Sequence, residues 1–272
     1  MPLTLADVLA VAEDLWPRAG AEPWDAPGLV VGDPSQPIER IRLVVDVVTE
    51  SVDDAIGAAA DLIIAHHPLL FRAVNSIDET AYRGAVVAKL IRADIALLSA
   101  HTNADVVADG TSDVLAARLG LAELRPIQAS AVPGTGLGRV GALPEPTTLG
   151  RLARAVAGLL PATAGGIRVA GDYDEPVRTV ALCGGAGDSL LNAAEVLAAD
   201  VYITADLRHH PASDAREQHL LGRGPALIDV SHWASEWLWL DVAAQQLRER
   251  LPSVIVTVSD VRTDPWDFAI TQ

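Results

Sequence analysis

The order of hydrophobic and polar positions along the chain changes between two periods. From Leu3 to about Ala19 the apolar residues recur at helical spacing, and Thr4 and Asp7 have the spacing of a capping box. Short β-branched runs then alternate with alanine-rich amphipathic segments. In chain order these are Ile41–Val48, Glu50–Ala60, Leu62–Ala65, Ala81–Ala93 and Ile95–Ser99. Alternating strands and helices predict an α/β layered fold with a largely parallel sheet.

The second half of the chain repeats the first. The stretch from Arg40 to His67 can be laid over Val177–Asp206 with a constant offset, so that Val44 matches Cys183. Each copy consists of a strand, a turn, an alanine-rich helix and a second strand. Two βαβ units of this kind predict two similar α/β lobes with a site between them. The alternative is that any two βαβ units look alike, and the sequence leaves this duplication open.

The expected boundaries follow from the repeat. We expect a first lobe over residues 1–128 and a second lobe with the C-terminal helix over residues 129–272, interleaved and without an inserted middle domain. A Gly- and Pro-rich crossover lies at residues 131–150, and its part GRVGALPEPTT could hold an edge strand.

The late chain predicts several more elements, after which the tail is expected to be ordered only if Trp266 and Phe268 find a groove. The expected elements are a helix at Ala212–Leu221, a strand at Ala226–Val230, a helix from about Ser231 to Arg250 and a strand at Ser253–Ser259.

Composition and charge restrict the classes of function. The 272 residues are 50% hydrophobic and 21% charged, which is enough apolar material for a sizeable core. A formal charge of -16 argues against non-specific nucleic-acid binding and against a basic membrane-surface protein. The single cysteine, Cys183, fits a reducing compartment, and the N-terminus lacks the positive region of a signal peptide. We therefore expect a cytoplasmic protein without a membrane partner.

The rarity of lysine and cysteine excludes further mechanisms. Lys89 is the only lysine, and it lies inside an amphipathic segment, so neither a P-loop nor a cofactor Schiff base has its lysine in place. No GxSxG elbow is present, and the one thiol is expected to be buried. Histidines and carboxylates remain as candidates for chemistry.

Two adjacent histidines leave the strand in IIAHHPLLF. Neighbouring strand residues point to opposite sides, so His66 and His67 suit two metal ions better than one. The alternative, one structural and one solvent-facing histidine, is the better reading of an isolated pair. Because the carboxyl ends of parallel strands are where α/β sheets bind ligands, the position itself favours a site.

The segment LLSAHTNAD follows another strand. It offers Asp105 as a candidate bridging carboxylate and His101 as a ligand, a donor behind the ligands or a general base. The alternative is that Asp105 caps the following turn.

A third candidate lies in LIDVSHWASEWLWL. His232 and Glu236 are spaced i, i+4 at the start of a helix, so one turn can present a nitrogen and a carboxylate to the same ion. The alternative is an ordinary first-turn pair, with the acid favoured by the helix dipole. We interpret the nearby tryptophans as packing residues.

Two further segments leave their role open. Asp206, His209 and His210 follow the strand of the second copy, where they line the cleft or form a surface group with Arg208. The glycines in LCGGAGDSLLNA could hold a phosphate on backbone N–H groups, but the full GxGxxG spacing is missing, which favours an ordinary tight turn.

Taken together, the candidates form a mixed nitrogen and oxygen donor set without a thiolate. Such a set suits Zn, Mn, Fe, Co or Ni. Four nitrogens and two carboxylates are too many for one catalytic ion and enough for two. A two-metal site activates water and clamps the oxygens of a phosphoryl or carbonyl centre.

The ordered motifs PWDxxGLxVG, AHHP, HTxxD, ADVYITxDLxxH and DxSHxxSE resemble those of the Nif-three-like dinuclear metal-centre proteins, also known as the GTP cyclohydrolase 1 type 2 family. The resemblance runs from Trp24 to Glu236. It implies two divalent metal ions per chain between two similar lobes, and a toroidal homohexamer built as a trimer of dimers. The implied ligands are His66, His67, Asp105, His232 and Glu236, with His101 close by in a catalytic or supporting role.

The resemblance also implies the reaction. We expect a metal-dependent hydrolase acting on a small molecule, most simply a nucleotide, by opening the guanine ring of GTP at C8 and hydrolysing the resulting formamide while His101 moves protons. One alternative is a two-metal phosphoesterase or nucleotide pyrophosphatase. The other is a non-catalytic metal-binding interaction protein. The substrate-binding residues stay unknown at this point.

Overall fold

The computed structural model describes residues 3–270, which divide into two compact units. The first unit comprises the chain up to Val107 together with Leu240–Thr263, and the second comprises Ala108–Trp239 together with the residues from Asp264 on. This division differs from the expected boundary at 128/129. The chain enters the second unit earlier because helix α5 (Thr111–Arg118) packs on strands of the second sheet, and the last strand pairs in the first sheet.

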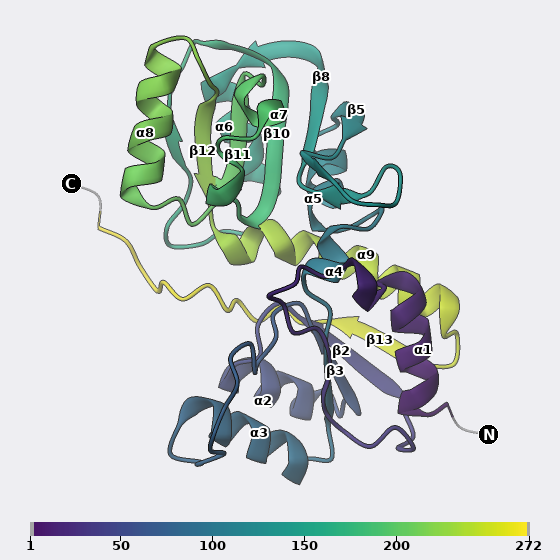
Figure 1. Ribbon diagram of the computed structural model, residues 1–272. Coiled ribbons are helices and arrows are strands. Elements are labelled where there is room, and N and C mark those ends of the chain that lie inside the picture. Colours follow the sequence, from purple (N-terminus) through teal and green to yellow (C-terminus); the bar gives the residue numbers. More distant parts are fainter. Residues whose placement is uncertain (1–2, 271–272) are drawn as a thin grey trace. The chain divides into compact units, whose positions relative to one another are not determined.

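The first unit is built around a five-stranded sheet of order β1-β4-β3-β2-β13, in which all pairs are parallel except that of the edge strand β1. Figure 1 shows α2 and α3 on one side of this sheet and α1 on the other. The strands are β1 (Gly28–Val31), β2 (Arg40–Val44), β3 (Leu62–Ala65), β4 (Ala96–Ser99) and β13 (Ile255–Val258). The helices are α1 (Leu5–Leu15), η1 (Arg18–Gly20), α2 (Thr49–Gly57), α3 (Tyr82–Arg92) and α4 (Thr102–Asp105).

Apolar side chains alternate along these parallel strands to fill the layer under α2 and α3. Ile63 and Leu97 from the sheet meet Val52 of α2 and Leu90 of α3 in one buried cluster. Burial of each such side chain contributes about 1.5–3 kcal/mol. Packing against α2 and α3 therefore stabilises the sheet, so the residues at the carboxyl ends of its strands can be polar.

The second unit contains a six-stranded sheet of order β5-β8-β10-β11-β12-β9. Its strands are β5 (Ala122–Arg125), β8 (Arg139–Thr148), β9 (Arg168–Ala170), β10 (Pro176–Ala186), β11 (Val201–Ala205) and β12 (Ala226–Val230), with a small hairpin of β6 (Gln128–Ala129) and β7 (Gly136–Leu137). Its helices are α5, α6 (Leu149–Leu159), η2 (Asp188–Leu190), α7 (Ala194–Leu197), α8 (His209–Leu220) and the first part of α9 (His232–Arg250), whose residues from Leu240 on belong to the first unit.

Two expectations about this second sheet are wrong. Only β10, β11 and β12 run parallel, so the sheet is mixed rather than largely parallel. Strand β8 is not an edge strand, because it pairs with both β10 and β5. The pattern of β5, four exposed residues, carried no alternation from which the missing neighbour could be predicted.

The internal repeat is visible in the pairing registers of the two units. In the first, Arg42 lies opposite Ile63 and Leu43 opposite Ile64; in the second, Ala181 lies opposite Tyr202 and Leu182 opposite Ile203, which is the same register at the offset read from the sequence. In both units the third parallel strand is followed by an antiparallel edge strand.

A pair of aspartates repeats as well. One oxygen of Asp61 accepts hydrogen bonds from the N–H groups of Glu39 and Arg40, at 2.8 Å each. The corresponding oxygen of Asp200 accepts from Arg178 and Thr179, at 2.9 and 2.7 Å. Both acids hold the entry of the second strand of a βαβ unit, so the two units are similar in detail and not merely in element order.

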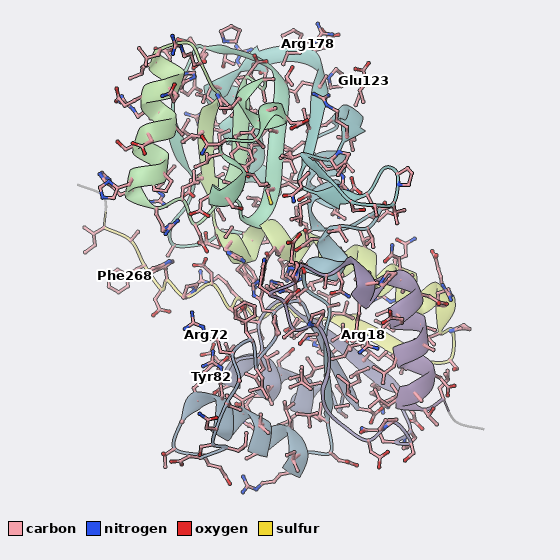
Figure 2. The ribbon with its side chains drawn as sticks, viewed as in Figure 1. Arg18, Arg72, Tyr82, Glu123, Arg178 and Phe268 are labelled. Atoms are coloured by element: carbon pink, nitrogen blue, oxygen red, sulfur yellow. The ribbon has the colours of Figure 1, made fainter. Side chains whose placement is uncertain are left out.

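Helix ends follow local rules with one exception. The capping box of α1 is confirmed, since Thr4 and Asp7 bond reciprocally. Helix α8 begins at His209, three residues before the expected start, because Pro211 occupies its first turn, where a missing N–H has no cost. In the tail, Trp266 and Phe268 are 67% and 78% exposed, so neither ring occupies a groove. Figure 2 shows Phe268 on the tail. Among the described residues, no helix has the length and apolar character needed to cross a membrane.

Candidate metal centre

Three histidines meet at the carboxyl edge of the first sheet. His66 and His67 directly follow β3, and His101 comes two residues after β4, its parallel neighbour. The backbone N–H groups of His66 and His67 donate to the carbonyls of Val44 and Val45, at 3.0 and 2.9 Å, so the backbone that carries both rings is held by the hydrogen bonds of the sheet. One ring nitrogen from each histidine lies within 4.8 Å of the other two. The sequence prediction that strand ends gather these residues holds within this unit.

The Nδ1 atom of each of these rings is already bonded to an oxygen. His66 Nδ1 lies 2.9 Å from the Ala100 carbonyl, which can only accept a hydrogen bond, so the proton is on Nδ1. His67 Nδ1 lies 2.7 Å from Asp46, and His101 Nδ1 lies 2.7 Å from Asp25. With Nδ1 protonated, the lone pair of each ring is on Nε2, which is the form that binds a metal ion or accepts a proton.

Asp25 is the best-held of these acceptors. Its buried carboxylate accepts from the N–H and hydroxyl of Thr102, at 3.0 and 2.5 Å, besides the bond with His101. Burial by itself raises the pKa of Asp25, but the hydrogen bonds from His101 and Thr102 outweigh it and lower the pKa to about 2. The carboxylate is thus ionised at neutral pH and fixes both the tautomer and the orientation of His101.

Asp105 lies near Nε2 of His66, the ring nitrogen that does not bond to Ala100. The distance from His66 Nε2 to Asp105 Oδ1 is 3.7 Å, too long for a hydrogen bond. Metal–nitrogen and metal–oxygen bonds are each about 2 Å long, so this separation fits two ligands of one ion. The turn-capping alternative for Asp105 does not account for this approach.

The second unit presents a separate pair of candidate ligands. His232 begins α9 two residues after the end of β12, and Glu236 lies one turn later, with 3.1 Å between His232 Nε2 and Glu236 Oε1. His232 Nδ1 bonds to Asp206 at 2.8 Å, and Asp206 directly follows β11. Burial lowers the pKa of His232, but the charge of Glu236 and the hydrogen bonds to Asp206 and Glu236 raise it well above its usual value. This position therefore strongly favours positive charge, either a proton or a metal ion.

Asp206 and the nearby His209 and His210 have different surroundings. Asp206 bonds to His232, whereas His209 and His210 lie on the exposed first turn of α8, with ring centroids 5.2 Å apart. Within residues 3–270 neither of these two histidines bonds to a candidate ligand. Arg208 pairs instead with Asp188 at 2.6 Å.

The glycine-rich segment has a different role from phosphate binding. Two of its N–H groups are occupied, since Gly184 donates to Ser112 and Gly185 donates to Ser235, at 3.2 and 2.9 Å. Gly185 adopts φ +67, and a Cβ there would lie 2.2 Å from Oε1 of Glu236. The missing side chain makes room for the carboxylate, a close approach that only glycine permits.

Sequence reasoning named all candidate ligands but missed two of the carboxylates behind them. Asp46 comes two residues after β2, as His67 comes two residues after β3, so its position at a strand end was a usable signal. Asp25 lies in a loop 76 residues before its partner, and nothing local marks that contact.

The donors fit divalent ions of the borderline class. The first unit supplies three imidazoles and Asp105, and the second supplies one imidazole and Glu236; Cys183 is not among them, and every Nδ1 is held by an oxygen. Comparison with known proteins adds the decisive observation. The family model for Duf34/NIF3 (NGG1p interacting factor 3) matches residues 3–265. The chain belongs to this family.

Individual relatives agree. A protein of Streptomyces coelicolor named GTP cyclohydrolase 1 type 2 homolog is 47% identical over 269 residues, covering 96% of this chain and 93% of the relative. A protein of the same name from Clostridium perfringens is 34% identical and covers 98% and 100%. A crystal structure of a Bacillus cereus protein related to NIF3 superposes with a TM-score of 0.90 at 26% identity, covering 99% of this chain and 100% of that one.

Proposed function

We propose that the protein is a metal-dependent hydrolase holding two divalent ions. His66, His67 and Asp105 of the first unit and His232 and Glu236 of the second are the proposed ligands. The observation that carries the proposal is a hydrogen bond at the same atom of each ring. All four histidines, His101 included, have Nδ1 bonded to an oxygen, which makes Nε2 the proposed ligand atom or base. His219 also has its Nδ1 bonded to an oxygen, that of Gly224, but its Nε2 is bonded to Glu175, which lies outside the candidate site.

The chemistry divides between the ions and the chain. Divalent ions at such a centre would lower the pKa of water and polarise the oxygen of a substrate. His101 is the proposed proton carrier, because Asp25 fixes its ring and one of its ring nitrogens lies within 4.8 Å of nitrogens of His66 and His67. Asp105 and Glu236 balance the charge of the ions, and Asp46 and Asp206 hold the rings of His67 and His232 in place.

The proposed reaction is hydrolytic opening of the guanine ring of GTP. It rests on the family and on the printed name of the relatives, and the donor set is compatible with it. Water adds at C8 of the ring, the bond from C8 to one ring nitrogen breaks, and a second water releases formate. In this sequence His101 takes the proton from the attacking water and returns it to the departing nitrogen.

The first test is metal content per chain by mass spectrometry. We expect about two ions on the wild type and fewer on His232→Ala/Glu236→Ala. The matched control is His209→Ala/His210→Ala, which removes an exposed histidine pair in the same unit and leaves the metal content unchanged. A folded wild type that takes up no metal on reconstitution would refute the proposal.

The second test separates the reactions. Release of formate from GTP identifies ring opening, and release of inorganic phosphate identifies a two-metal phosphoesterase. A protein that keeps its metals and releases neither product from nucleotides is a metal-binding interaction protein. The proposed homohexamer is checked independently by light scattering.

A further inference from the structure

Two aromatic side chains of the first unit are exposed beside the histidine cluster. Trp24 is 58% exposed and Phe71 is 39% exposed. Their ring centroids lie 5.7 Å apart, and they lie 6.0 and 6.4 Å from the His101 ring. All three contacts are edge-to-face, with interplanar angles of 74°, 75° and 88°. The proposed proton carrier therefore lies at the side of an open aromatic pair.

Trp24 and Phe71 are placed differently from the tryptophans of the core. Trp16 and Trp239 are fully buried, whereas Trp24 and Phe71 are exposed beside the histidines. Both rings are also attached to the segments that form the site. Trp24 directly precedes Asp25, the partner of His101, and Phe71 lies in the loop that begins at His66 and His67.

We propose that Trp24 and Phe71 form a stacking platform that positions the planar heteroaromatic ring of the substrate against His101. This inference rests on the proposed function. Aromatic side chains bind flat heteroaromatic rings through their faces, and the interaction tolerates any base because every base has a π face. Because Trp24 and Phe71 meet at 74°, a ring stacked on the face of one meets the other edge to face, with the His101 ring about 6 Å from both centroids.

The neighbouring arginine indicates that this ring carries phosphate. Arg72 directly follows Phe71, and no hydrogen bond or ion pair joins it to any residue in the described range 3–270. Its side chain stands clear of the ribbon (Figure 2). In a chain of formal charge -16, an arginine without a carboxylate partner is available to an anion on the ligand.

The test measures the ring-dependent part of binding by equilibrium dialysis. The probes are 7-deazaguanosine 5′-monophosphate, whose ring cannot be opened by hydrolysis at C8, and ribose 5-phosphate, which has no ring. The readout is the dissociation constant of ribose 5-phosphate divided by that of the nucleotide. We expect Trp24→Leu and Phe71→Leu each to lower this ratio by about 5- to 150-fold, and Trp24→Phe to retain most of it.

Controls separate stacking from folding and from the metal centre. Trp266→Leu removes an exposed tryptophan of the tail and is expected to leave the ratio unchanged. Because Trp24 is exposed, its variants should unfold at the wild-type temperature. The same ratio is measured on His232→Ala/Glu236→Ala, where the platform is intact.

Each outcome decides one question. A wild type that binds both probes equally well, or a Trp24→Leu/Phe71→Leu variant that keeps the wild-type ratio, would overturn the platform. A ring preference that persists in a protein without bound metal would support the platform while the proposed hydrolase fails.

Discussion

Replacing Gly185 by alanine tests whether the close approach of the backbone shapes the half-site of the second unit. The added Cβ would lie 2.2 Å from Oε1 of Glu236 and 3.2 Å from Nε2 of His232. Carbon and oxygen atoms normally approach to about 3.3 Å, so the carboxylate must retreat by about 1 Å. Glu236 is buried, so the carboxylate cannot move into solvent without exposing its side chain. The clash therefore displaces a proposed ligand.

Two contributions to the cost can be separated by a control. Gly185 has φ +67, and a side chain in this left-handed region costs about 1–2 kcal/mol. Gly222 has φ +70 with nothing within 4 Å of an added Cβ, so Gly222→Ala carries the strain without the clash. We expect Gly222→Ala to lower the free energy of unfolding by about 1–2 kcal/mol. For Gly185→Ala we expect about 3–4 kcal/mol, because a buried charged group is also displaced.

The assays are chemical denaturation and metal competition against a coloured chelator. Gly185→Ala should bind its metal at least tenfold more weakly than wild type, since even groups behind the ligands matter by 10–100-fold, roughly. Gly222→Ala should bind metal normally. If Gly185→Ala and Gly222→Ala are equally stable and bind metal equally well, the assignment of Gly185 and Glu236 to one half-site is wrong.

Three further predictions follow from single contacts. Asp46→Ala should weaken metal binding by about 10–100-fold by releasing the ring behind it, whereas Asp214→Ala, an exposed carboxylate, should not; equal metal affinities would contradict this. Asp113→Ala should lower the free energy of unfolding, measured by chemical denaturation, by about 3 kcal/mol, because the fully buried guanidinium of Arg139 loses its carboxylate partner. A loss below about 1 kcal/mol would show that the carbonyls of Gly136 and Gly138 are enough to stabilise the guanidinium. In the metal-free protein, the raised pKa of His232 contributes stability that is fully present below about pH 6.5 and is lost as the pH rises through the pKa of His232 in the folded state. The difference in melting temperature between the wild type and His232→Gln should therefore shrink at alkaline pH. A difference that grows with pH would refute this direction.

Local spacing decided much of what this chain is. The capping box of Thr4, the i, i+4 pair of His232 and Glu236, and the histidines after β-branched runs are short-range features, and the structure places them as their periods predict. The duplication was also readable, since equal offsets in sequence become equal registers once strands pair in the same order.

The tertiary structure alone decided which groups hold the ligands. The acceptors Asp25, Asp46 and Asp206 lie 76, 21 and 26 residues from the histidines they bond, and no helical or strand period relates residues at such distances. The same holds for the interior position of β8 and for the glycine that makes room for Glu236. The sequence determined the types of the proposed ligands and the strand ends that carry them, whereas the tautomer and orientation of each ring depend on contacts that exist only after the sheets have formed.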